Sequence, residues 1–354
     1  ANEQIDAISH CLTNVDGDYV SLAKTALRLS LSCIYGSLIP LEFGQDALFG
    51  TPRPHSMNFD LALLDPAYVN VVVNGHEPFV GIALIRHCSD PMVQGEAIKA
   101  GAKGIRIIGS IETGQEILQR TEMSPVFIGM TGNWLSIEPL IATEAVDLFA
   151  MDMNCCPPSL EAYAKKYPTT FVSVSPLVNI PGVAKHIDYK PEEVSAQASH
   201  LASMAIENFK ARRGRGISID QPIQPAIVGF STESILEALG GTLTPLLNAI
   251  KSGKIKGIVA LISCSTLGNG PQDLPTIIIA KELIKRDILV LSMGCGNAAM
   301  QVGGLCTQQA RELAGEGLRS ICSALGIPPV LSFGTCSDTG RVSVLVSAVA
   351  DALG

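Results

Sequence analysis

The chain has 354 residues, of which 47% are hydrophobic and 16% charged, with a net charge of −8. This length allows two or three domains, and so apolar a composition is typical of α/β proteins whose strands are buried on both faces. The acidic balance and the absence of a basic stripe argue against a nucleic-acid partner. No apolar run reaches the roughly 18 residues of a membrane span and no signal peptide opens the chain, so we expect a cytoplasmic protein.

Residues 1–64 are expected to form a short helical segment. Apolar residues recur at helical spacing from Tyr19 to Leu38, with Ser21 as a candidate N-cap, and a glycine and two prolines in Phe49–Pro54 end the pattern. From Tyr68 strand-like and helix-like segments alternate, which predicts a parallel sheet. The strands expected in this first Rossmann-like domain, residues 65–210, are Val69–Val73, Gly104–Ile108, Val126–Ile128, Leu148–Met151 and Phe171–Val174.

A long amphipathic helix is expected at residues 191–213, and the basic run Arg212–Gly216 is interpreted as an interdomain linker rather than a phosphate-binding patch. A second α/β alternation predicts another Rossmann-like domain at residues 211–354. Its expected strands are Ala226–Val228, Ile258–Ile262, Ile288–Leu291 and Val330–Phe333. The predicted fold class is therefore α/β, with two Rossmann-like parallel-sheet domains after a short helical segment.

Six hydrophobic runs are each followed, within a few residues, by a side chain that can bind a metal ion. They are His76 after VNVVVNG, Glu112 after GIRIIGSI, Cys155 after VDLFAMDMN, Cys264 after GIVALIS, Cys295 after ILVLSMG and Cys336 after PVLSFGT. Because the carboxyl ends of parallel strands share one edge of a sheet, residues far apart in sequence can converge there. Two facing sheets would each contribute three ligands to one site between the domains.

A single cysteine is more often a buried apolar residue than a ligand. Three of the four at strand ends, Cys264, Cys295 and Cys336, are flanked by glycine or serine, and such small neighbours let backbone N–H groups approach the sulfur atoms of an inorganic core. Because thiolates select iron–sulfur centres and histidine suits borderline metals, we predict an iron–sulfur type site. Cys156 is expected to support Cys155, or to replace it as ligand. The remaining cysteines, expected in the core, are Cys11, Cys33, Cys88, Cys306 and Cys322.

At these residues the chain resembles the nickel–iron carbon monoxide dehydrogenase and hybrid-cluster protein superfamily. The resemblance covers roughly residues 48–342 and rests on several ordered motifs. They are Phe49–Pro52 (FGTP), Gly75–Pro78 (GHEP), Thr113–Glu116 (TGQE), Asn154–Leu160 (NCCPPSL), and the segments ending at or surrounding Cys264, Cys295 and Cys336.

The resemblance implies a cluster between two Rossmann-like domains, held by one histidine and five cysteines. His76, Cys155, Cys264, Cys295 and Cys336 match five of these positions, but Glu112 stands where the dehydrogenases have the sixth ligand, a cysteine. A carboxylate is a hard ligand that favours iron with oxygen ligands over nickel in a sulfide-rich core. The hybrid-cluster branch of the superfamily uses glutamates in this way. The alternative is that Glu112 is a solvated acid at a helix N-terminus.

The leading hypothesis is a redox enzyme holding an Fe/S/O hybrid-type cluster and reducing a small substrate such as hydroxylamine. The resemblance also implies a ferredoxin-like electron donor or acceptor and a homodimer in the full-length protein. The dehydrogenases carry an N-terminal cysteine-rich segment and a C-terminal lysine region without counterparts here, which suggests a fragment. No catalytic acid or base is assigned.

Three alternatives stay open. The first is a true Ni,Fe carbon monoxide dehydrogenase that tolerates Glu112 and interconverts CO and CO2. The second is a dinucleotide-binding domain, because Gly294–Ala299 fits G-x-G-x-x-A after a strand. The acidic residue that this fingerprint requires at the end of the next strand, about 20 residues later, is not found. The third is a non-enzymatic cluster scaffold or metal-insertion partner.

Overall fold

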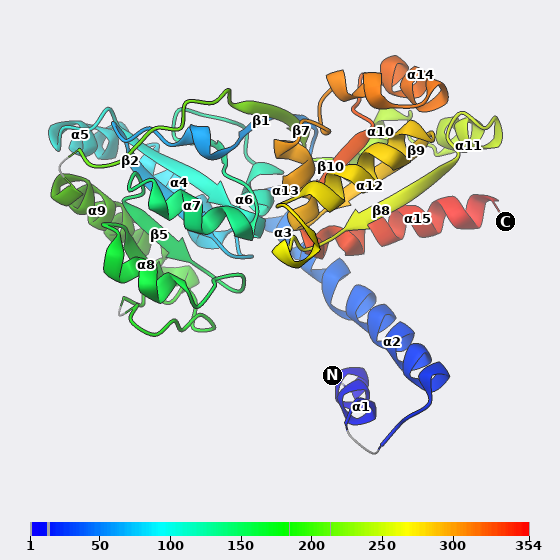
Figure 1. The fold of residues 1–354 in the computed structure, drawn as a ribbon, viewed down its shortest axis with the longest axis horizontal. Helices are drawn as coiled ribbons and strands as arrows, with labels where there is room; N and C mark the ends of the chain where they lie inside the picture. The colour runs from blue at the N-terminus through cyan, green and yellow to red at the C-terminus, as the bar shows by residue number, and fades with distance from the viewer. Residues whose placement is uncertain (1, 13–14, 184, 213, 354) are drawn as a thin grey trace.

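The computed structural model describes residues 2–12, 15–183, 185–212 and 214–353 (Figure 1). The chain opens with helices that project from the rest of the molecule, and α2 follows an Asp18 N-cap, whose carboxylate accepts from the Ser21 N–H at 3.1 Å. Ser21 is therefore not the cap, because the carboxylate three residues earlier captures its amide. The opening helices are α1 (Asn2–His10), α2 (Tyr19–Cys33), the π-helix η1 (Ile34–Leu38) and α3 (Ile39–Phe49).

The first sheet has seven strands in the order β6-β5-β2-β3-β4-β1-β7, and all neighbours are parallel except β1 and β7. The strands expected in the first domain all form: Leu148–Met151 has the expected bounds, and the other four are shifted or extended by one or two residues. An additional strand, β1, forms within the segment expected to be helical, because Met57 and Phe59 alternate with polar residues and bury one face. The strands are β1 (His55–Phe59), β2 (Val69–Asn74), β3 (Ile105–Ser110), β4 (Phe127–Met130), β5 (Leu148–Met151), β6 (Thr170–Ser173) and β7 (Gln224–Val228).

The second sheet is parallel, in the order β10-β9-β8. Its strands are β8 (Gly257–Ile262), β9 (Ile288–Met293) and β10 (Val330–Gly334). Strand β7, which was expected in the second domain, instead pairs antiparallel with β1 at the edge of the first sheet, where its Pro225 is tolerated. The chain then crosses to the second sheet, since Phe230 N donates to Ser332 O at 3.1 Å. The domain boundaries at residues 210 and 211 stay a prediction.

Helices cover both faces of each sheet, as expected for an α/β fold (Figure 1). On the first sheet, Val71 and Ile107 pack toward α4, α5 and α9, whereas Val72 and Phe149 pack toward α7 and α8. Helix α6 is buried along its whole length and contacts both β3 of the first sheet and β10 of the second. The helices are α4 (Phe79–Cys88), α5 (Pro91–Lys99), α6 (Ile111–Leu118), α7 (Ile137–Ala142), α8 (Leu160–Lys166) and α9 (Val194–Arg212).

The helices of the second sheet are α10 (Thr232–Ala238), α11 (Thr244–Lys251), α12 (Leu274–Lys285), α13 (Cys295–Val302), α14 (Glu316–Leu325) and α15 (Thr339–Leu353). Short 3-10 helices complete the described chain: η2 (Leu61–Leu63), η3 (Trp134–Ser136), η4 (Pro191–Glu193), η5 (Leu267–Asn269), η6 (Gln309–Leu313) and η7 (Cys336–Asp338). Within the described ranges, no helix combines the length and apolar character that a membrane span needs.

The basic run after α9 is not a simple exposed linker. Arg212 is 1% exposed, and its guanidinium bonds the Asp147 carboxylate at 2.7 Å and the Pro66 and Tyr68 carbonyls at 2.7 and 2.9 Å. The linker interpretation was therefore wrong for Arg212, because a buried carboxylate captures its side chain. Arg215 remains exposed, and Arg213 lies outside the described residues.

Three of the five cysteines expected in the core, Cys88, Cys306 and Cys322, are fully buried. Cys11 is exposed and Cys33 half-buried. The prediction was wrong for these two because α1 and α2 pack against little else, and helix α2 buries only Thr25.

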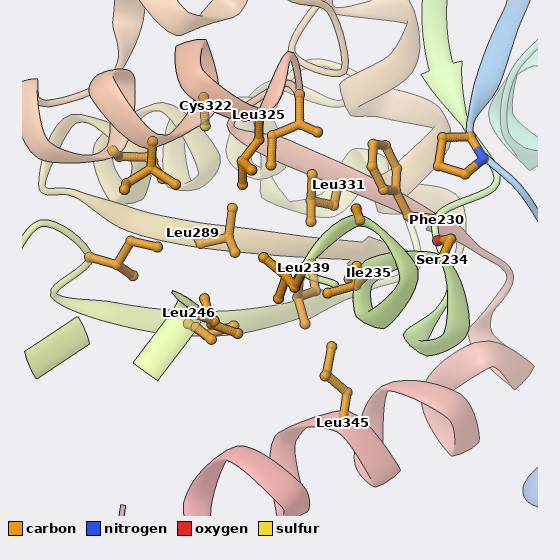
Figure 2. Close-up of a pocket in the computed structure, with 18 of the residues that line it drawn as sticks. Phe230, Ser234, Ile235, Leu239, Leu246, Leu289, Cys322, Leu325, Leu331 and Leu345 are labelled. Carbon is orange, nitrogen blue, oxygen red and sulfur yellow. The ribbon is translucent and has the colours of Figure 1, made fainter. Parts of the chain in front are cut away.

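A cavity of about 310 Å³ lies on the face of the second sheet that α10, α14 and α15 cover. Its walls are mostly aliphatic, as Figure 2 shows for Leu239, Leu289, Leu331 and Leu345. None of the six candidate ligands lines it, so it is separate from the site described next.

Candidate metal centre

The turn after β2 presents His76 toward the second sheet. Gly75 adopts a φ of 138°, and a Cβ there would collide with the Asp152 carboxylate, so only glycine fits. The His76 Nδ1 lies 3.1 Å from the Met153 carbonyl oxygen, which orients the ring and leaves Nε2 available to a metal. Burial lowers the pKa of the His76 imidazole and favours its neutral, metal-binding form.

Asp152 holds the loops that carry three of the candidate ligands. It is 4% exposed, and its Oδ1 accepts hydrogen bonds from the backbone N–H groups of His76 and Glu77, while its Oδ2 accepts from the Thr113 hydroxyl at 2.6 Å. Asp152 itself precedes Cys155 by three residues, and Thr113 follows Glu112. One buried carboxylate thus ties together the ends of β2 and β5 and the start of α6.

Glu112 lies in the first turn of α6 and points across to the second sheet. It is 3% exposed, and its Oε2 accepts the Cys336 backbone N–H at 2.6 Å. Burial raises the pKa of this carboxyl to about 7. Because Glu112 is buried, the interpretation as a solvated helix acid is wrong. Ligand atoms of His76, Glu112 and Cys336 lie within 4.8 Å of one another, which is close enough to share one metal centre.

Cys155 occupies a strained turn after β5. Both Asn154 and Cys155 adopt left-handed backbone angles, with φ of 68° and 50°, a conformation that costs free energy for residues other than glycine. Burial, followed by the nearby charge of Glu112, raises the pKa of the Cys155 thiol to about 11. Cys156 points elsewhere, since its Sγ lies 3.4 Å from the Asn74 side-chain nitrogen that donates to it.

The second sheet supplies Cys264, Cys295 and Cys336 from the carboxyl ends of β8, β9 and β10. Small residues allow these ends to approach closely: a Cβ on Gly296 would lie 2.2 Å from the Ser263 hydroxyl oxygen. Burial raises the pKa of Cys295 to about 12, and burial with the neighbouring Glu112 raises that of Cys336.

The donor set fits an iron–sulfur core. The negative charges of Glu112, Cys155 and Cys264 each raise the pKa of Cys295 and Cys336, so the structure gathers these side chains in one electrostatic field. Four thiols, a neutral imidazole and a carboxylate are costly to ionise together in a partly buried place, and a cationic iron core would offset that cost. Among the candidate ligands, the His76 imidazole suits a borderline metal and the hard Glu112 carboxylate suits iron with oxygen ligands.

Buried amides hold the two sheets in register beside this donor set. Gln115 of α6 and Gln301 of α13 exchange hydrogen bonds of 2.6 and 3.1 Å, and Asn297 donates to both Gln115 and Ser332. Fully paired amides of this kind specify one arrangement of the surfaces that they join. The relative placement of the candidate ligands is therefore fixed by contacts that do not involve a metal.

The dinucleotide alternative finds no support in the turn before α13. The amides that would receive a phosphate are already used: Gly294 N donates to Gly334 O at 3.0 Å and Gly296 N to Ser263 O at 2.9 Å. Residues Cys295–Gln301 are all buried. The turn thus packs against neighbouring strands and leaves no backbone N–H of Gly294 or Gly296 for a dinucleotide phosphate.

Residues that the sequence analysis missed also reach the site. In the sequence, only the position of Asp152 directly after a strand could have indicated a role at the site. Asn133 and Trp134 follow β4, and none of the candidate ligands follows that strand, so no pattern drew attention to them. Trp134 Nε1 donates to Ser265 O at 2.7 Å, and Asn133 Nδ2 donates to Ser265 Oγ at 3.0 Å.

Two largely parallel sheets that bring together an imidazole, a carboxylate and four thiols define a class of α/β protein whose donor set suits a metal cluster. The chain belongs to the Prismane/CO dehydrogenase family, whose model matches residues 1–354. This confirms the resemblance noted in the sequence.

Curated proteins similar to this chain are named carbon monoxide dehydrogenases. The chain is 56% identical over 353 residues to carbon monoxide dehydrogenase 2 of Methanosarcina mazei, covering 99% of this chain and 56% of that protein. It is 58% identical over 347 residues to the carbon monoxide dehydrogenase of Archaeoglobus fulgidus, covering 98% and 55%. The chain therefore spans about half the length of the curated relatives it matches.

Among solved structures, the chain is similar to an as-isolated, nickel-free carbon monoxide dehydrogenase of Thermococcus sp. AM4. The TM-score is 0.93 at 38% identity, covering 100% of this chain and 55% of the other. It is also similar to carbon monoxide dehydrogenase IV of Carboxydothermus hydrogenoformans, with a TM-score of 0.91 at 36% identity, covering 99% and 56%. The predicted α/β fold class with parallel sheets is confirmed.

Proposed function

We propose that this chain forms the cluster-binding part of an oxidoreductase of the carbon monoxide dehydrogenase type. The observation that carries the proposal is the convergence of His76, Glu112 and Cys336, from three different strand ends, within one metal-binding distance. Cys155, Cys264 and Cys295 complete the donor set. An iron–sulfur cluster, with or without nickel, supplies electrons and open coordination positions for a small substrate.

The names of the relatives support CO as the substrate. Proteins 56–58% identical to almost the whole chain are called carbon monoxide dehydrogenases. The residues of this chain would hold the cluster, orient it through the His76 ring and the Glu112 carboxylate, and keep the two sheets together around it. Electrons would pass to or from a ferredoxin-like carrier, and the full-length protein would form a homodimer in the cytoplasm.

A second candidate is reduction of a small N–O substrate such as hydroxylamine at an Fe/S/O hybrid-type cluster. The observation that favours it is Glu112, a buried hard ligand placed among soft ones. Nickel prefers the sulfur-rich environment that a cysteine at this position would complete. The proposal of a non-enzymatic cluster scaffold shares the same site but predicts no turnover.

One set of measurements separates these functions. Anaerobically purified protein is analysed for nickel, iron and acid-labile sulfide, and assayed for CO oxidation with a viologen acceptor and for hydroxylamine reduction with reduced viologen. CO oxidation that requires nickel supports the first function, and hydroxylamine reduction at a nickel-free centre supports the second. A chain with a full iron content and neither activity contradicts both and leaves the scaffold. A chain that binds no iron contradicts the site itself.

A further inference from the structure

The loop after β4 reaches the centre although it supplies no ligand. His76, Glu112 and Cys155 follow the ends of strands β2, β3 and β5. Strand β4 lies beside β3 in the same sheet and is followed by residues 131–134. Gly132 O accepts the Ile111 N–H at 3.1 Å, which places this loop directly beside the Glu112 turn.

From there the loop crosses to the second sheet. The Trp134 indole Nε1 donates to the Ser265 carbonyl at 2.7 Å, next to Cys264 in the chain. The Asn133 side chain, 1% exposed, donates to Ser265 Oγ at 3.0 Å and to Asp273 Oδ1 at 2.7 Å. Ser265 Oγ in turn donates to Asp273 at 2.9 Å, so the network closes on itself.

The same tryptophan also faces a second cysteine. Its backbone N–H lies near the Cys295 thiol and lowers the pKa of that thiol, against the larger effect of burial, which raises it. Trp134 therefore bonds the Cys264 loop through its side chain, and its backbone lies close to Cys295. Hydrogen bonds to ligand sulfurs and the groups that orient ligands set the potential of iron–sulfur centres.

We propose that Trp134 and Asn133 are positioning residues that fix the Cys264 and Cys295 side of the cluster from the opposite sheet and thereby tune its reduction potential. This proposal rests on the proposed cluster-binding function. It assigns to β4 the role of a strand that orients ligands instead of providing one.

Two variants test the proposal. Trp134→Phe keeps an aromatic ring and the backbone N–H but removes the indole N–H, and Asn133→Ala removes both side-chain donations. Tyr163→Phe is the matched control, because it removes one aromatic hydrogen bond, 2.9 Å to Glu138, that involves neither Ser265 nor any candidate ligand. Trp134 is the sole tryptophan of the chain, so indole fluorescence reports its environment in every other variant.

The first measurement does not need the cluster. Hydrogen exchange of the metal-free protein is followed in residues 263–266. Trp134→Phe is expected to exchange there about three- to tenfold faster than the unaltered protein, which is what loss of one ordinary hydrogen bond allows. Asn133→Ala, which loses two such bonds, is expected to exchange at least as fast as Trp134→Phe. The Tyr163→Phe control should leave this segment unchanged. Unaltered exchange in both loop variants would overturn the proposal even if no iron is bound.

The second measurement uses the loaded protein. Trp134→Phe is expected to retain the iron and sulfide content of the unaltered protein while its electron paramagnetic resonance signal and midpoint potential shift, and Tyr163→Phe is expected to shift neither. Identical spectra and potentials in Trp134→Phe and the unaltered protein would overturn the tuning role. Failure of the unaltered protein to bind iron would instead contradict the proposed function, and the exchange data would still decide the positioning role.

Discussion

The Glu112 carboxylate accepts the backbone N–H of Cys336 at 2.6 Å, although the two residues belong to different sheets. A side chain proposed as a ligand thus also orients the loop of another ligand. Its Oε1 remains free of that bond and can face a metal. The bond explains how a carboxylate can occupy a place between thiols without being left unpaired in a buried site.

The identity of residue 112 is expected to set the metal content of the centre. Glu112→Cys supplies a soft thiolate, so we expect the nickel content per chain and the rate of CO oxidation to rise relative to the unaltered protein. Glu112→Gln serves as the matched control, because it keeps the shape but removes the charged ligand, and it should lower the iron content. Elemental analysis and the viologen assay are the measurements. Equal nickel content in Glu112→Cys and the unaltered protein would contradict this role.

Removal of the Asp152 carboxylate is expected to weaken metal binding without touching a ligand. Asp152→Ala frees the His76 and Glu77 amides and the Thr113 hydroxyl, and loss of such an orienting group typically lowers metal affinity about 10- to 100-fold. Asp152→Asn is the conservative variant, since its amide oxygen can still accept from the two backbone N–H groups. Competition with an iron chelator measures the affinity. If both variants release iron as slowly as the unaltered protein, Asp152 does not position the site.

Much of this fold could be predicted from the sequence because strands buried on both faces appear as continuous apolar runs, as in Val69–Val73. The residues that follow such runs were correctly expected at one edge of each sheet. Strand β1 escaped prediction because its five residues read HSMNF, with only two strongly buried side chains. Strand β7 was assigned to the wrong sheet, since pairing with β1 depends on tertiary contacts that no local pattern encodes.

For a related reason, sequence patterns could not predict the residues that support the site without binding the metal. Asp152 and Trp134 act through hydrogen bonds to backbone groups of other strands, and those partners come close only in the folded chain. Arg212 was misassigned because its neighbours are basic and glycine-rich, which is typical of a linker, while its partner Asp147 lies 65 residues away.

The buried Arg212–Asp147 pair leads to a prediction about stability. Both side chains are 0% exposed, and Arg212→Met would leave Asp147 as an uncompensated buried charge, so unfolding free energy is expected to fall by about 3–5 kcal/mol. Arg215→Met is the control: that residue is exposed and pairs with Glu144, so its loss should cost less than about 1 kcal/mol. Denaturant unfolding of the metal-free protein measures both. Similar losses in the two variants would show that burial does not decide the contribution.

A second buried cluster, Glu42, Glu116 and Asp338, predicts how stability depends on pH. Its members have metal-binding atoms within 4.8 Å of one another, and Arg120 and Arg341 pair with some of their oxygens, but Glu42 Oε1 and Asp338 Oδ1 have no hydrogen-bond partner in the described structure. Burial, followed by the charges of Asp338 and Glu116, raises the pKa of Glu42 to about 10. The folded protein therefore keeps a proton on Glu42 that the unfolded chain releases near its ordinary value of 4.5.

The sign of the effect follows from this difference. The contribution of Glu42 is fully present below pH 4.5 and is lost as the pH rises toward 10, so unfolding free energy is expected to fall across that interval by at most about 1.4 kcal/mol per pH unit for this proton. Glu42→Gln carries no titrating proton and should flatten the dependence, whereas Glu122→Gln, at an exposed position, should leave it unchanged. Denaturant unfolding of the metal-free protein at several pH values gives the slope. If Glu42→Gln does not reduce the slope, another carboxyl of the cluster holds the proton and the role given to Glu42 is wrong. Glu116, whose pKa burial raises to about 8, is then the next carboxyl to replace.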